Sequence, residues 1–277
     1  MPPHAIPAEK ELEVCFAVYE DCRDVIPPQY LDETGDNFYA KGGGEIREDA
    51  FTHHNVLYRS PVEADQIHDP SFGQWTCVGG DNEGRACEPT DRNSCGAQGQ
   101  CRSELKDSVG CQGYGPAGPG GIGNVLGLGF GIEKEGFYQS FPAHGIFYWS
   151  SHAYNLTTKD GIHHVWRNEY FADDRRFKEQ RIDVTKDLTV ATGTPPFERK
   201  TVCRDYVFKQ GDGLLALTSH THKRGERFFM SVKGGEQIYE TFTYDEPLYK
   251  RFEPALVFNS SDPAQRTMEY CATYNNG

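Results

Sequence analysis

The residues of this 277-residue chain that are best suited to chemistry are its 10 histidines. His220 and His222 lie in an alternating stretch of apolar and polar residues. Residues i and i+2 of a strand point to the same face, so these two imidazoles would lie side by side. Such a pair needs one further ligand to complete a metal site. The alternative is a pair of surface histidines on an exposed strand.

His53 and His54 form a different pattern, because adjacent residues of a regular strand point to opposite faces. Both can reach one ion only if the strand bends or if one ring turns back through its Nδ1 atom. His163 and His164 have the same form, and we expect a partly exposed strand pair there. His152 stands alone in a mostly apolar strand, where a buried histidine is more often hydrogen-bonded than ligating. Three histidines have no informative spacing: His4, His68 and His144.

No other catalytic pattern competes with the histidines. The sequence contains no Gly-x-Ser-x-Gly elbow, no P-loop and no His-Glu-x-x-His zinc motif. The glycines near 120–132 do not form a dinucleotide-binding fingerprint that leads into a helix. Any catalytic chemistry is therefore expected at the histidines.

Nine cysteines indicate an oxidising compartment, and we expect an extracytoplasmic protein, either secreted or periplasmic. Five of them lie in the segment 77–111, where the spacing lacks the tight Cys-x2-Cys knuckle of many zinc sites and favours disulfides. The odd number leaves at least one thiol free or paired between chains. The first ten residues lack the apolar core of a signal peptide, so we expect that the leader has been removed.

Composition limits both the fold and the partners. Aromatic residues make up 13% of the chain, with 30 Gly and 16 Pro, which is typical of strands joined by turns. The net charge of -13 makes nucleic acid an unfavourable partner, because its phosphates would be repelled. No apolar run approaches the roughly 20 residues of a membrane-spanning helix, so no membrane span is expected.

Short alternating stretches predict the strands that would position these side chains. In the first half we expect strands at 11–20, 51–58, 144–155 and 165–171, with a disulfide-pinned insertion at 77–111. In the second half we expect strands at 199–207, 213–222, 227–232, 237–244, 255–258 and 267–274. A charged stretch at 173–181 suggests domains at 1–175 and 176–277. The expected fold class is all-β: two jelly-roll-type antiparallel β-sandwich domains with a disulfide-rich insertion in the first.

In chain order, several segments resemble the ascorbate-dependent type II copper monooxygenases, the family that includes peptidylglycine α-hydroxylating monooxygenase and dopamine β-monooxygenase. Residues 219–225 resemble the His-x-His strand of the oxygen-activating copper. Residues 52–57 resemble the His-His pair of the electron-transfer copper, and residues 149–154 the strand with its third histidine. Three cysteine-containing segments agree in the same order: 14–17, 74–77 and 270–274. The likeness is to bacterial members rather than to the animal enzymes.

The resemblance implies two copper ions, one on each domain. His53, His54 and His152 would hold the electron-transfer copper, since three imidazoles without an anionic ligand suit both Cu(I) and Cu(II). His220 and His222 would hold the oxygen-activating copper and would be the catalytic ligands. Ascorbate would supply electrons, and O2 would hydroxylate a C–H bond of a small organic substrate.

The sequence departs from the family at the second copper. The family's thioether ligand lies beyond the segment that 270–274 resembles, and the sequence ends at Gly277 before that point. We therefore expect a truncated second domain or a different third ligand. Met268 is the candidate substitute, because it lies on a strand of the same domain. Thr218 stands where peptide-hydroxylating members carry a substrate-binding arginine, which makes a peptide carboxylate an unfavourable substrate.

The resemblance also implies disulfide partners. We expect Cys15 to bridge into the insertion, with Cys77 as its partner, and so to tie the opening strand to the segment after the histidine pair. Cys203 and Cys271 are the only cysteines of the second half, so they either pair with each other or lack their family partners.

Two other functions stay open beside the monooxygenase. The first is a non-catalytic copper-binding protein for storage or delivery, which the absence of an aligned thioether favours. The second is a secreted, disulfide-stabilised structural or adhesion module in which the histidines are incidental. Copper content separates both copper functions from the structural module, and ascorbate-dependent consumption of O2 separates the enzyme from the binding protein.

Overall fold

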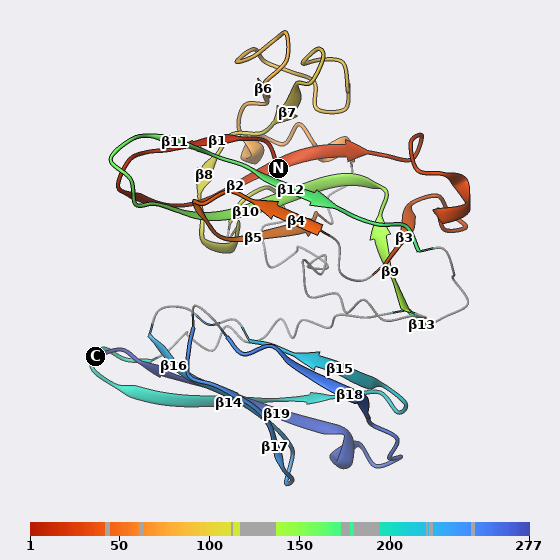
Figure 1. The fold of residues 1–277 in the computed structure, drawn as a ribbon, viewed down its shortest axis with the longest axis vertical. Helices are drawn as coiled ribbons and strands as arrows, with labels where there is room; N and C mark the ends of the chain where they lie inside the picture. The colour runs from red at the N-terminus through yellow and green to blue at the C-terminus, as the bar shows by residue number, and fades with distance from the viewer. Residues whose placement is uncertain are drawn as a thin grey trace. The chain divides into compact units, whose positions relative to one another are not determined.

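The computed structural model describes residues 1–41, 45–60, 64–111, 113–116, 137–172, 178–179, 194–219, 221, 224–244 and 247–277. The chain divides into two compact units, Met1–Ile182 and Asp183–Gly277 (Figure 1). The described residues form strands joined by turns and short 3-10 helices, which confirms the all-β fold class. None of the helices among them is long and apolar enough to cross a membrane. The expected boundary between 175 and 176 lies outside the described residues.

The strands of the first unit follow one another along the chain as β1 (His4–Ile6), β2 (Lys10–Asp21), β3 (Asn37–Lys41), β4 (Glu45–Glu48), β5 (Thr52–Arg59), β6 (Thr76–Val78), β7 (Gln100–Arg102), β8 (Lys106–Asp107), β9 (Phe137–Pro142), β10 (His144–Asn155), β11 (Gly161–His163), β12 (Val165–Asn168) and β13 (Lys178–Glu179). Short 3-10 helices lie between some of them: η1 (Pro28–Tyr30), η2 (Ala64–Gln66), η3 (Pro70–Phe72) and η4 (Val109–Cys111).

β10 is the central strand of the first unit. It pairs antiparallel with β2 on one side and with β5 on the other, and β7 and β6 continue the sheet beyond β2 (Figure 1). The sheet order is therefore β5-β10-β2-β7-β6, with β8 also paired to β2. Smaller sheets, β13-β9-β3, β12-β4 and β1-β11, complete the unit.

Successive side chains of a strand point to opposite faces of a sheet. In the central sheet both faces are covered by other parts of the unit. On one face Phe16 of β2 and Trp149 of β10 pack with Phe38 of β3, so the β3–β9 pair covers this side as in a sandwich. On the other face Tyr148 of β10 packs with Trp75, which comes from the segment before the insertion. The expected strand at 11–20 is confirmed.

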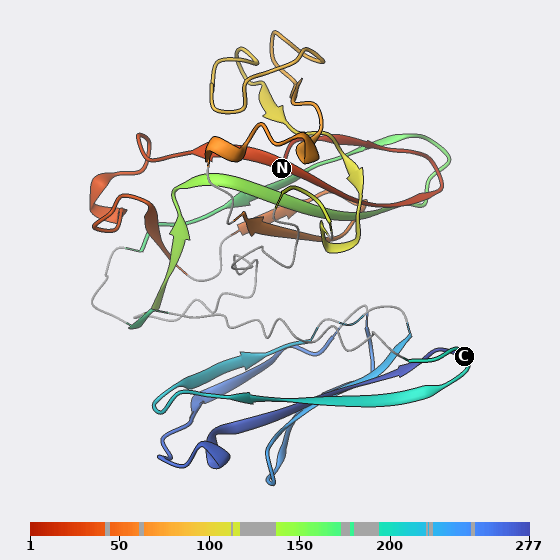
Figure 2. The same cartoon turned by 180° about the vertical axis from the view of Figure 1, so that it is seen from behind.

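Disulfides pin the insertion, as expected, but Cys15 has a different partner. Cys15 is bonded to Cys111, while Cys77 is bonded to Cys95, and a further bond joins Cys87 and Cys101. The Cys15–Cys77 prediction is wrong because β7 lies between β2 and β6. At about 4.8 Å per strand, residues two strands apart are about 10 Å apart, too far for a disulfide. Figure 2 shows the cysteine-rich segment, coloured orange to yellow, at one edge of the unit. The remaining free thiol is that of Cys22.

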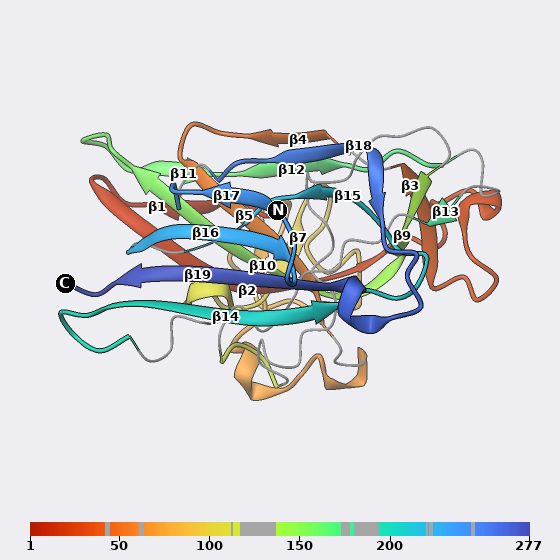
Figure 3. The same cartoon turned by 90° about the horizontal axis from the view of Figure 1, so that it is seen from below.

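The second unit is also sandwich-like. Its strands are β14 (Arg199–Val207), β15 (Gly213–Leu217), β16 (Gly225–Val232), β17 (Gln237–Thr241), β18 (Lys250–Val257) and β19 (Thr267–Asn275), with one described 3-10 helix, η6 (Pro263–Arg266). Four of these strands form a sheet in the order β14-β19-β16-β17 (Figure 3), and β15 pairs with β18. Phe228 and Tyr270 of the larger sheet pack with Leu217 of the smaller pair.

A disulfide joins the two strands at the edge of this larger sheet. Cys203 and Cys271 lie directly opposite each other on β14 and β19 and are bonded. The first of the two alternatives expected for these cysteines is therefore confirmed.

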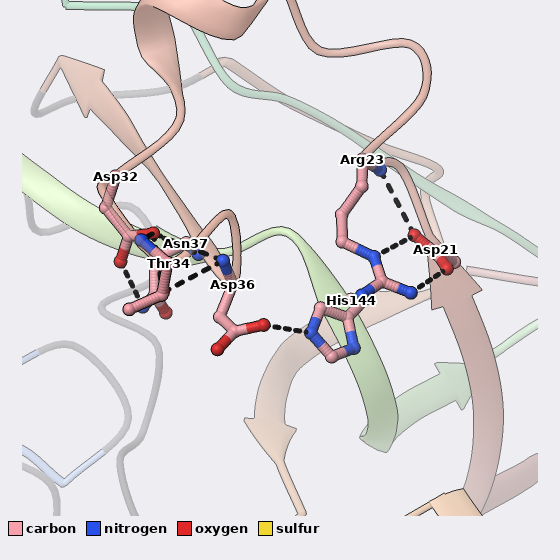
Figure 4. Close-up of polar contacts among 7 residues, drawn as sticks. All are labelled: Asp21, Arg23, Asp32, Thr34, Asp36, Asn37 and His144. Carbon is pink, nitrogen blue, oxygen red and sulfur yellow. Dashed lines mark hydrogen bonds and ion pairs between the residues drawn. The ribbon is translucent and has the colours of Figure 1, made fainter.

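Polar contacts fix the turns that lead into β3 and β10 (Figure 4). Asp32 accepts hydrogen bonds from the hydroxyl of Thr34 at 2.8 Å and from the backbone N–H of Asp36 at 3.1 Å. Asp36 in turn lies 2.9 Å from Nε2 of His144, the first residue of β10. The role of His144 is therefore to tie the start of the central strand to this loop.

The disulfide between Cys15 and Cys111 is expected to stabilise the fold more than a bond that closes a short loop. Its cysteines are 96 positions apart, against 18 for Cys77 and Cys95. On the chain-entropy model, replacing both cysteines by alanine costs about 4.7 kcal/mol for the first pair and about 3.2 kcal/mol for the second. Urea unfolding measures both losses, with Cys22→Ala as a control that removes a thiol but no bond. Equal losses for the two pairs would contradict the expectation.

Stability should also depend on pH through Asp21. The hydrogen bond from Arg23 lowers the pKa of Asp21 to about 2, although partial burial acts in the opposite direction. Because this pKa lies below the usual value near 3.9, the contact stabilises the fold above pH 4 and is lost as the pH falls towards 2. Arg23→Gln should lower the free energy of unfolding at pH 7 by roughly 0.5–1 kcal/mol, since solvent screens this pair. Urea unfolding should show that the difference in free energy of unfolding between the parent and the variant narrows from pH 4 to pH 2. A difference that stays constant over this range would contradict the prediction.

Candidate metal centre

His53 and His54 both lie opposite one residue of β10, because β5 contains one extra residue at this point. His152 pairs with His54 and Ala153 pairs with Thr52, so the register passes over His53. An extra residue of this kind is a β-bulge, which bends the strand and re-aims a side chain. The bulge supplies the bend that two adjacent histidines need in order to reach one ion.

The three rings converge as expected. Nδ1 of His53 lies 3.2 Å from Nδ1 of His152 and 3.1 Å from Nδ1 of His54. One ligand atom from each of the three residues lies within 4.8 Å of the others. Nitrogens bound to one ion at about 2.0–2.1 Å, with tetrahedral or trigonal angles, are about 3.3–3.6 Å apart. The residues present therefore fit a metal ion bound by three imidazoles.

Glu11 of β2 holds His152 from the opposite side of its ring. The Glu11 carboxylate lies 2.8 Å from Nε2 of His152. A carboxylate acceptor at Nε2 places the ring proton there and leaves the Nδ1 lone pair free for a metal. In the β2–β10 ladder Glu11 lies opposite Tyr154, which is two positions from His152 along β10. Glu11 is therefore the diagonal neighbour of His152 on the same face of the sheet.

Sequence reasoning did not single out Glu11. The usable signal was the polar start of the predicted strand at 11–20, but its partner depends on the register between β2 and β10.

The centre has a buried side and an open side. His152 has a side chain only 10% exposed, whereas His53 is exposed. The ring of Tyr154 lies with its centroid 5.0 Å from the ring centroids of both residues. Glu11 and Tyr154 also line an open hollow of about 400 Å³, together with Glu9, Lys10, Asn155 and Leu156. A small molecule in this hollow would lie beside two residues that contact the histidine rings.

The histidines expected to hold the second copper lie outside the part of the chain that the structure describes. His220 and His222 are not among the described residues, so their common orientation stays a prediction. β15 ends at Leu217, so the expected strand at 213–222 is too long: the residues just before His220 are not in a strand. Met268 is buried in the core of the second unit, opposite Tyr206 of β14.

The expectation of a partly exposed pair at His163 and His164 is wrong for His163. Its side chain is fully buried, because it lies directly opposite His4 on the inward face of the β1–β11 pair. Nδ1 of His163 lies 3.0 Å from both carboxylate oxygens of Asp49. Burial lowers the pKa of His4 to about 4, with smaller contributions from His163 and from the positive charge of Arg102.

Two other groups of potential ligand atoms lie close together in the described residues, but their sulfurs are in disulfides. They are Cys77, Cys87 and Cys95 in the insertion, and Cys203, Glu269 and Cys271 in the second unit. A disulfide sulfur is not a thiolate and so is not a zinc ligand. The expectation of disulfides rather than a zinc site in the insertion is confirmed.

No protein-family model matches this chain, and no curated protein matches it. The resemblance to copper monooxygenases therefore stays a hypothesis that rests on the residues themselves.

The contact between Glu11 and His152 predicts a loss of metal affinity when the carboxylate is neutralised. Glu11→Gln should weaken copper binding at the three histidines by about 10–100-fold, because a neutral amide makes the imidazole a poorer ligand. Competition with a copper chelator measures the affinity. Glu9→Gln is the matched control, since it removes a carboxylate from the same hollow without touching His152, and it should change the affinity little. Equal losses for the two variants would show that net charge, not the hydrogen bond, is responsible.

Proposed function

We propose that this protein is an extracytoplasmic copper monooxygenase, secreted or periplasmic, that hydroxylates a C–H bond of a small organic substrate. It uses O2 and a reductant such as ascorbate. The observation that carries the proposal is the convergence of His53, His54 and His152 through their Nδ1 atoms. The four disulfides support an oxidising location.

The ligand set favours copper. It consists of three imidazoles, with no carboxylate or thiolate among the converging atoms. Among divalent first-row metals, nitrogen sites bind Cu(II) most tightly, and neutral imidazoles also accept Cu(I). Bound copper would supply one-electron transfer at this centre.

The residues around the centre support such a role. Glu11 holds the proton on Nε2 of His152, so the ring keeps one orientation in either charge state of the ion. The hollow beside Tyr154 leaves room for a small electron donor next to the histidines. His220 and His222 would orient O2 chemistry at the second site, as the family resemblance implies.

A second candidate function is a copper-binding protein without catalysis. Met268, the candidate third ligand of the second site, is only 5% exposed and packs in an apolar core. A thioether that stays in this core leaves His220 and His222 without their candidate third ligand. That arrangement favours weak binding over O2 activation.

Copper content and O2 consumption test the proposal. Full-length protein loaded with Cu(II) should hold between one and two copper ions per chain, and dialysis should remove the ion at His220 and His222 first. It should consume O2 when ascorbate is added. His220→Ala should lose only the weak ion and the O2 consumption, whereas His152→Ala should lose the tightly held ion. His68→Ala is the control, since this exposed histidine pairs with Glu88 and is not one of the proposed copper ligands.

The outcomes separate the candidate functions. Copper at His152 without ascorbate-dependent O2 consumption supports the copper-binding protein. No copper in the parent protein supports the structural module. A His220→Ala variant with full copper and full O2 consumption would exclude His220 as a catalytic ligand.

A further inference from the structure

A second pair of histidines lies buried in the first unit, on strands other than those of the candidate copper centre. His4 of β1 and His163 of β11 are direct partners in an antiparallel pair of strands, which lie side by side in Figures 1 and 2. Their side chains face inward, with residue exposures of 4% and 0%. The ring centroids are 5.2 Å apart, and the ring planes are nearly perpendicular, at 83°.

Three nitrogens of these two rings have no hydrogen-bond partner within the described part of the chain. They are Nδ1 and Nε2 of His4 and Nε2 of His163. A buried polar atom without a partner is unfavourable, and native proteins satisfy nearly all such atoms with protein groups, water or ions. Two adjacent imidazoles in this state therefore point to a bound species between or beside them.

Asp49 fixes the protonation of one of the two rings. Both of its carboxylate oxygens lie 3.0 Å from Nδ1 of His163. The carboxylate also accepts hydrogen bonds from the backbone N–H groups of Phe51 and His164, so it is held rigidly. The proton of His163 is thereby placed on Nδ1, and the unpartnered Nε2 carries a lone pair, as in metal-binding histidines backed by a carboxylate.

We propose that His4 and His163 bind a monovalent, soft metal ion, Cu(I), through Nε2 of His163 and one ring nitrogen of His4. The described residues offer no group of three ligand atoms here, and structural zinc sites almost always use four ligands. Cu(I) accepts a low coordination number and imidazole ligands. The site takes one ion per chain and is separate from His53, His54 and His152.

The charges near the pair disfavour a divalent ion. The carboxylate of Asp49 behind His163 supplies one negative charge. Arg102 adds an opposing positive charge near His4: its guanidinium donates to the backbone oxygen of Pro3 at 3.1 Å and lies over the ring of Phe16. With this cation nearby, a divalent ion would leave more uncompensated charge than a monovalent one.

Titration of the full-length protein with Cu(I), under anaerobic reducing conditions and against a colorimetric Cu(I) chelator, measures the number of bound ions. The parent protein should bind one more Cu(I) ion than His4→Phe, which keeps an aromatic ring but has no nitrogen. The same substitution at His144, a residue outside the pair, should leave the number unchanged. An equal number of ions in the parent and in His4→Phe overturns the proposal.

A measurement on the unsubstituted protein avoids dependence on the folding of a variant. The ring 15N signals of His4 and His163 should shift when Ag(I), a redox-inert substitute for Cu(I), is added in excess of all the proposed histidine sites. Ring signals that stay unchanged overturn the proposal. So does a scalar coupling across an N–H···N hydrogen bond between the two rings that persists with the ion present. Because the site does not involve His53, His54 or His152, the result is independent of the proposed monooxygenase activity.

Discussion

One extra residue in β5 is the constraint on which the candidate copper centre depends. In a regular ladder His53 and His54 would point to opposite faces of the sheet, and only one of them could reach His152. The bulge sets both residues against the single position His152, at the expense of regular pairing at that point. The central strand tolerates this irregularity because β10 pairs with β2 along all of its length on the other side.

The same strand also decides how exposed the centre is. Along β10 the side chains pass from Tyr148, which is fully buried under the insertion, to His152, which is buried, and to Tyr154, which is partly exposed. The centre therefore lies where the apolar cover of the sheet ends. A position nearer Tyr148 would place the rings under that apolar cover.

Local patterns predicted much of this arrangement, and long-range pairing accounts for what they missed. Alternation predicted the strands at 11–20 and 144–155, because their inward residues repeat every second position. The partner of Cys15 depends on β7 lying between β2 and β6, which no local pattern contains. β1 and β11 have three residues each, too short for a periodic signal, so the meeting of His4 and His163 was not foreseen. The histidine ligands were predictable as a set only through the family resemblance.

The two histidine groups share one structural feature and differ in their exposure to solvent. In each, a carboxylate fixes the proton of one imidazole: Glu11 at Nε2 of His152, and Asp49 at Nδ1 of His163. The opposite ring nitrogen thereby carries the lone pair: Nδ1 of His152 in the first group and Nε2 of His163 in the second. The open group of three imidazoles is accessible to water, which could follow a change in the charge of a bound ion. The closed pair beside Asp49 lacks this access to water. Burial, rather than the type of side chain, therefore distinguishes the two groups.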